Sequence, residues 1–138
     1  MKSLLLHCKD FGTVITGLAT RPNDIVHGDI LDEKQSAHDC ILSLVTIEED
    51  DTLDKVSLLI KEIIKFSNET SHKNVFLCPF AHLSNRLAKP KEALSILKEI
   101  LKQLQTTDIM VTEGHFGSDK EALLHLYGHP GNVRFREF

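Results

Sequence analysis

Residues 39–47 read Asp-Cys-Ile-Leu-Ser-Leu-Val-Thr-Ile and are apolar at most positions. A strand covered on both faces shows such a run, whereas a strand with one wet face alternates apolar and polar residues. A second run, Asn74–Phe80 (NVFLCPF), is closed by Pro79, which has no N–H to donate to a sheet ladder. These two segments predict buried strands within an α/β domain.

Two helical patterns lie on either side of the second strand. Asp50 or Asp51 suits the N-cap of a first helix, which should end at about Asn68. Pro90 suits the first turn of a second helix. The apolar stripe of the first helix is Val56, Leu59, Ile60, Ile63 and Ile64. The stripe of the second is Ala93, Leu94, Leu97, Ile100, Leu101 and Leu104.

The remaining segments complete a mixed sheet. Residues 19–34 are expected to be mostly loop, and residues 128–131 a turn. No glycine-rich phosphate loop follows any strand, so a doubly wound nucleotide fold is not expected. The other expected strands are Ser3–His7 and Phe11–Leu18, paired through a short turn, then Ile109–Val111 and Ala122–Tyr127. The fold class is therefore α/β, with one mixed β-sheet and two main helices.

Composition is that of one ordinary domain over residues 1–138, with 41% apolar and 26% charged residues. The sequence contains no apolar run long enough for a membrane span and no signal-peptide core, so a cytoplasmic protein is expected. The net charge of −4 argues against a domain that binds a long stretch of nucleic-acid duplex. It does not argue against a domain that binds only the end of an RNA. Buried free thiols are expected at Cys8, Cys40 and Cys78.

Histidine is the unusual feature of the composition, with eight residues. No pair lies at i, i+4 in a predicted helix and no Cys pair occurs, so we expect no metal site and no cofactor. His38 and His125 fall within strand patterns and are expected to be face or core residues. His82 follows a strand end and Lys120 lies near a glycine-containing loop, where they could position a water and offset negative charge. The residues alone favour a surface histidine and a surface lysine over a catalytic pair.

The segment Asn74–Leu94 (NVFLCPFAHLSNRLAKPKEAL) closely resembles the signature of archaeal threonyl-tRNA synthetase editing domains. The resemblance continues with Phe116-Gly117, Lys120 and the Gly-His-Pro run at 128–130, at the family's separations. The leucine-rich start closed by His7 also matches. Each motif is short, but their order and spacing over nearly the whole chain make the resemblance specific.

This resemblance implies a fold similar to D-aminoacyl-tRNA deacylases, as a homodimer. It implies hydrolysis of L-seryl-tRNA(Thr), with help from the 2′-hydroxyl of the terminal adenosine and with the acceptor end of tRNA(Thr) as partner. It also implies that His82 and Lys120 are the catalytic residues. The implied substrate-binding residues are His7, Val45, Pro79, Phe80, Ala81, Ala93, Phe116 and Gly117.

Two departures from the family pattern leave alternatives open. Val133 stands where the family tends to place a glutamate, and the stretch after His7 is one residue longer, with Asp10 as its acidic residue. The alternatives are a D-aminoacyl-tRNA deacylase and a non-catalytic tRNA-docking or dimerisation domain. The chain has no class II synthetase motifs, so it is either an excised domain or a small freestanding protein. We favour an excised amino-terminal domain whose partner is the synthetase catalytic domain.

Overall fold

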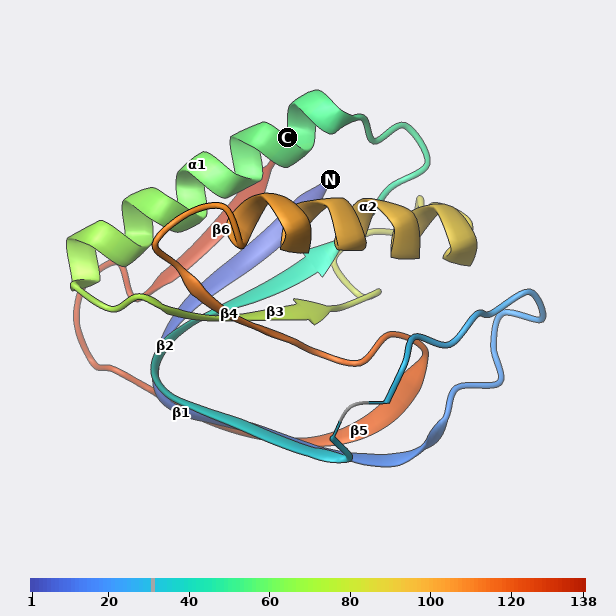
Figure 1. Ribbon diagram of the computed structural model, residues 1–138, viewed down its shortest axis with the longest axis horizontal. Coiled ribbons are helices and arrows are strands. Elements are labelled where there is room, and N and C mark those ends of the chain that lie inside the picture. Colours follow the sequence, from blue (N-terminus) through green and yellow to red (C-terminus); the bar gives the residue numbers. More distant parts are fainter. Residues whose placement is uncertain (31) are drawn as a thin grey trace.

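The computed structural model describes residues 1–30 and 32–138 (Figure 1). Leu31, within the predicted loop 19–34, lies outside the described residues. In chain order the elements are β1 (Lys2–Leu18), β2 (Lys34–Thr46), α1 (Leu53–Thr70), β3 (Asn74–Pro79), α2 (Pro90–Leu104), β4 (Met110–Glu113), β5 (Ser118–Leu126) and β6 (Val133–Glu137). The predicted α/β class with two main helices is confirmed.

All six strands form one mixed sheet in the order β4-β3-β2-β1-β5, with β6 also paired to β1. The pairs β2–β3 and β3–β4 are parallel, and the pairs made by β1 are antiparallel. β6 pairs with Lys2–Leu6 and β5 with Cys8–Leu18, so the two strands share one side of β1. The predicted mixed sheet is therefore confirmed.

Two strand predictions were wrong. Ser3–His7 and Phe11–Leu18 are not separate strands joined by a turn, because β2 pairs with β1 along nearly its whole length. A register shift between Cys8 and Asp10 against β5 accommodates the polar residues that read as a turn. The strand β6, in which arginines alternate with other residues, was not predicted.

Both helices cover one face of the sheet, as Figure 1 shows, and the long β1–β2 ribbon curves away from them. Val75 and Leu77 of β3 belong to the helix-covered core. Phe76 and Cys78 belong to a smaller core on the other face, where Phe11 packs edge-on to Phe76 at 4.8 Å between ring centroids. Coverage on both faces explains the unbroken apolar run of this strand.

The predicted start is confirmed for one helix and wrong for the other. α2 begins at Pro90 as predicted, but the N-cap of α1 is Thr52 and not Asp50 or Asp51. The Asp51 carboxylate instead contacts the amino group of Met1 and the ammonium group of Lys55. All three cysteines are buried free thiols, as expected. Among the described residues no helix is long and apolar enough to cross a membrane.

Candidate functional site

The parallel strands β2, β3 and β4 end at one edge of the sheet, and the segments that follow them meet there. Ligand sites of open α/β sheets form at such edges. After β4, the backbone N–H of Gly114 donates to the carbonyl of Leu77 at 2.8 Å. A Cβ on Gly114 would lie 3.0 Å from the Phe76 ring, so the glycine lets the two segments approach closely.

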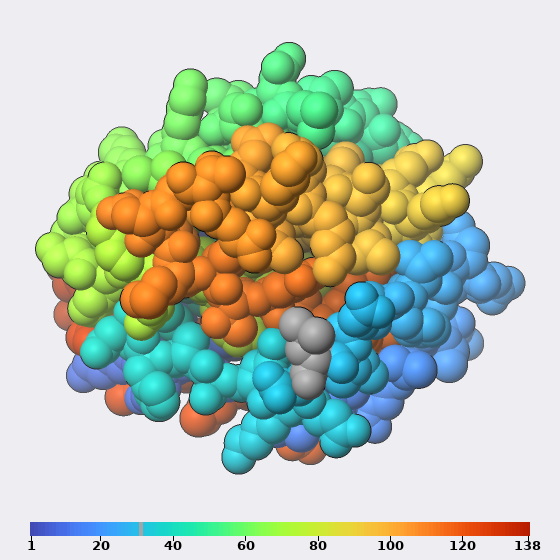
Figure 2. All heavy atoms as spheres, in the orientation of Figure 1, coloured from blue at the N-terminus to red at the C-terminus, as the bar shows by residue number. Residues whose placement is uncertain are grey.

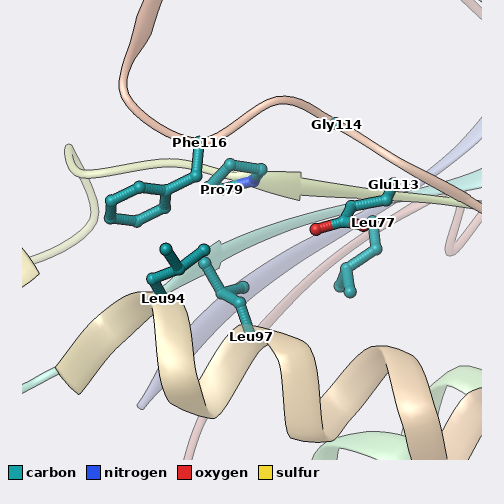
Figure 3. Close-up of a pocket in the computed structure, with 7 residues that line it drawn as sticks. All are labelled: Leu77, Pro79, Leu94, Leu97, Glu113, Gly114 and Phe116. Atoms are coloured by element: carbon teal, nitrogen blue, oxygen red, sulfur yellow. The ribbon is translucent and has the colours of Figure 1, made fainter. Parts of the chain in front are cut away.

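A shallow cleft lies at this edge, between α2 and the ends of β3 and β4. Figure 3 shows Leu94 and Leu97 of α2 pointing toward Pro79 and Phe116. The complete lining is Leu77, Pro79, Leu94, Leu97, Glu113, Gly114 and Phe116. Two of the candidate binding residues, Pro79 at the end of β3 and Phe116 in the segment after β4, thus line the same cleft.

The loop after β3 is held by Thr46, whose side chain is 1% exposed. Its hydroxyl donates to the carbonyl of Phe80 and accepts the backbone N–H of Leu83 at 3.4 Å. The backbone N–H of Phe80 donates to the carbonyl of Val45 at 2.9 Å. The loop therefore leaves the sheet in a fixed direction and presents Ala81 and His82 to solvent.

The His82 ring lies edge-on to the Phe80 ring, with 5.1 Å between centroids, and makes no hydrogen bond to the described residues. Val45 and Ala93 lie beneath this surface. Their side chains are 1% and 8% exposed and belong to the helix-covered core, not to the cleft lining. The carbonyl of Val45 holds the backbone of Phe80, and Ala93 packs in the core beneath α2.

The segment after β4 requires glycine at position 117. Gly117 has φ = +80°, and a Cβ there would lie 2.4 Å from the carbonyl oxygen of Val26. Its own carbonyl accepts the backbone N–H of Ala19 at 2.9 Å. The backbone of residues 116–117 is therefore pressed against residues 19–28, and a side chain at 117 would separate them.

Lys120 is half-buried, and its ammonium group donates to the carbonyl of Ser118 at 3.0 Å. Burial lowers the pKa of Lys120, and the neighbouring Cys78 and Asp119 partly oppose this. Burial also raises the pKa of the Cys78 thiol to about 11, against the opposing effect of the Lys120 charge. The raised pKa makes Cys78 a poor nucleophile.

His7 lies away from His82 and Lys120, toward the beginning of β3. His7 pairs with Ile41 of β2. The preceding residue of β2, Cys40, pairs with Asn74, the first residue of β3. The Nδ1 of His7 lies 2.7 Å from Nε2 of His129, and its Nε2 lies 2.8 Å from Nδ1 of His72. Two elements of the family resemblance, His7 and the Gly-His-Pro run, thus meet in a cluster in which His7 is buried, His72 is partly buried and His129 is exposed.

Asp10 lies close to this histidine cluster on β1. Its carboxylate accepts hydrogen bonds from His38 at 2.6 Å and His125 at 3.1 Å, which lower the pKa of Asp10. Both histidines are exposed on strand faces, as predicted. In the described part of the chain, no three His, Cys, Asp or Glu side chains are placed to hold a metal ion.

Three residues near the cleft were not singled out from the sequence. Thr46 reads as one more strand residue, and Glu113, which pairs with Lys98 at 2.8 Å, reads as a surface charge. His115 was counted among the histidines without a role, yet it is 5% exposed. Their importance depends on contacts with distant segments, which no local pattern encodes.

The whole chain, residues 1–138, matches the family model described as the Archaea-specific editing domain of threonyl-tRNA synthetase. The chain belongs to this family. The editing domain is 32% identical over 133 residues to a threonine–tRNA ligase of Staphylothermus marinus, covering 94% of this chain and 21% of that protein. A threonine–tRNA ligase of Pyrococcus horikoshii is 34% identical over 103 residues, covering 72% and 16%.

This editing domain thus spans about a fifth of the length of these relatives. A solved structure of the c-Myc DNA unwinding element binding protein superposes with a TM-score of 0.73 and 13% identity, covering 100% of this chain and 99% of that one. At that identity the likeness shows the fold alone. It confirms the D-aminoacyl-tRNA deacylase-like α/β fold. Membership of the family supports a role in tRNA proofreading within protein biosynthesis.

Proposed function

We propose that this domain hydrolyses the ester of L-seryl-tRNA(Thr) and so removes serine that a threonyl-tRNA synthetase has attached in error. The observation that carries the proposal is the cleft, where Pro79 and Phe116 face each other between the His82 loop and the segment that leads to Lys120. Both segments hold the family motifs. In the proposal, residues 1–138 form one domain.

The chemistry requires positioning more than a strong nucleophile. The ester is already activated, and the 2′-hydroxyl of the terminal adenosine helps to activate the attacking water. Lys120 orients that hydroxyl or stabilises the oxyanion, and His82 holds the water or the sugar hydroxyl. The carbonyl that the Lys120 ammonium now contacts is that of Ser118, so substrate would replace this contact.

The cleft suits a small aminoacyl group. The backbone of residues 79–81 and the Phe116–Gly117 segment would hold the aminoacyl group and the terminal adenosine. A synthetic site for threonine gains only about 1–3 kcal/mol from the one methyl group that serine lacks, so a second, hydrolytic site is needed. Rejection of threonine by the editing site would then complete the discrimination.

We also propose the partners. The acceptor end of tRNA(Thr) and the synthetase catalytic domain are the macromolecular partners, in the cytoplasm. A second copy of the chain would cover the sheet face away from the helices. There Val133 and Phe135, 46% and 50% exposed, pair with Leu6 and Leu4 of the smaller core.

A non-catalytic docking role is the second candidate, and Val133 favours it. This residue provides no carboxylate, and it lies on β6 opposite Leu6, toward the His7 cluster. Binding of tRNA without turnover would support that role. Hydrolysis of D-aminoacyl-tRNA in preference to L-seryl-tRNA(Thr) would instead support a D-aminoacyl-tRNA deacylase.

The experiment compares three substrates with the purified domain: L-seryl-tRNA(Thr), a D-aminoacyl-tRNA, and L-seryl-tRNA(Thr) that ends in 2′-deoxyadenosine. The proposal predicts rapid hydrolysis of the first only. Normal hydrolysis of the 2′-deoxy substrate would refute the part assigned to the RNA hydroxyl. Hydrolysis of the D-aminoacyl ester alone would refute the assigned substrate.

A further inference from the structure

His115 is a buried histidine whose two ring nitrogens are both engaged. Its Nε2 lies 2.7 Å from the carbonyl oxygen of Gly28, and its Nδ1 lies 2.8 Å from Oγ of Ser118. A carbonyl oxygen can only accept, so the hydrogen must be on Nε2. In the neutral ring, Nδ1 then accepts the hydroxyl hydrogen of Ser118. The ring thus joins residue 28 to the beginning of β5.

Backbone hydrogen bonds connect the same two segments on either side of this ring. The N–H of Gly28 donates to the carbonyl of Phe116 at 3.0 Å, and the N–H of Ala19 donates to the carbonyl of Gly117 at 2.9 Å. Figure 2 shows the two segments side by side on one face, the first in blue and the second in orange. Residues 19–28 therefore pack against the Phe116–Gly117 backbone and support it.

Ser118 links His115 to Lys120. Its hydroxyl is bonded to the imidazole, and its carbonyl accepts the Lys120 ammonium at 3.0 Å. Ser118 also begins β5, where it pairs with Leu18 of β1. A single residue, Ser118, thus contacts both the buried ring and the ammonium group.

We propose that His115 is a positioning residue of the editing site, which fixes Ser118 and through it the Lys120 ammonium. The inference rests on the proposed ester hydrolysis for its functional meaning, but the contacts themselves do not depend on it. Catalytic groups must be held within about 0.5 Å of their working position. A displacement of about 1 Å by a distant change can lower a rate about 100-fold.

The test uses the variants His115→Phe and Ser118→Ala, with His27→Phe as the matched control. The His27 ring also contacts a backbone carbonyl, that of Ala19 at 2.9 Å, but it is exposed and has no contact with Ser118. The lysines are reductively methylated with ¹³C, and the Lys120 signal is titrated by NMR. This readout needs no substrate. Because Ser118→Ala removes only a hydroxyl, this variant keeps the test informative if His115→Phe fails to fold.

In the wild type, Lys120 should titrate below an ordinary lysine. In His115→Phe and Ser118→Ala its titration should move up toward the ordinary range, because the ammonium is released to solvent. The control should leave it unchanged. An unchanged Lys120 titration in both variants would overturn the inference.

Turnover of L-seryl-tRNA(Thr) gives the second readout. Ser118→Ala should lower kcat about 10- to 100-fold with little change in KM, and should have less than about 2-fold further effect in a Lys120→Met background. Fully additive losses would refute positioning through Lys120. A wild type that is inactive, with the Lys120 titration still shifted by the variants, would refute the proposed function and leave the positioning role supported.

Discussion

Replacing Gly117 by alanine tests how the site backbone is built. The new Cβ would lie 2.4 Å from the carbonyl oxygen of Val26 and 3.0 Å from Cδ2 of His27, at φ = +80°. The left-handed backbone costs an L-residue about 1–2 kcal/mol, and overpacking typically costs about 1–3 kcal/mol. Since the blocking atom belongs to the backbone, the segment 19–28 must move. We expect a loss of about 2–4 kcal/mol in the free energy of unfolding.

For a domain of this size, that loss lowers Tm by roughly 7–14 °C. Thermal unfolding followed by circular dichroism measures it, with Gly17→Ala as control, because a Cβ on Gly17 meets no atom within 4 Å. Hydrolysis of L-seryl-tRNA(Thr) at 25 °C should also fall, since Phe116 and Lys120 would be displaced. A Tm within about 2 °C of the control, with full activity, would refute the close approach of the two segments.

Three further outcomes are expected. Thr46→Val leaves the Phe80 carbonyl without its hydroxyl donor. It should lower the free energy of unfolding, measured in urea, by about 1–3 kcal/mol and should slow turnover. An unchanged urea midpoint would contradict this. Burial, His72 and His129 lower the pKa of His7, so stability should be full above about pH 6.5 and decline as the pH falls below it. His7→Asn should flatten that decline. Burial also lowers the pKa of Lys120, so a rate that needs its ammonium should decline at a pH below the usual lysine range near 10.4.

The strongest local patterns predicted the fold well. The apolar run of β3 and the proline at the start of α2 gave both elements nearly at their true bounds, because burial on both faces and the lost N–H of proline act locally. β1 was divided in two because polar residues near its register shift resemble a turn. β6 was missed because its pairing with the first half of β1 depends on topology, which charge patterning does not reveal.

The two candidate residues that line the cleft were identified from motifs at or near the ends of neighbouring strands. Pro79 ends β3 and Phe116 lies just after its parallel neighbour β4, so their meeting at one edge follows from the strand order. The locations of His7 and Ala93, away from the cleft lining, follow from the long-range packing of β1 and α2. The positioning roles of Thr46 and of the buried histidine after β4 depend on contacts with other segments.

The most direct test of the proposed function is single-turnover hydrolysis of L-seryl-tRNA(Thr) and L-threonyl-tRNA(Thr) by the purified domain. Lys120→Met is compared with Lys102→Met, which changes an exposed lysine in the last turn of α2. We predict rapid loss of serine but not threonine, strongly slowed by the change at Lys120 and unaffected by the change at Lys102. Hydrolysis of neither ester by the wild type, or equal serine release by Lys120→Met, would contradict the account.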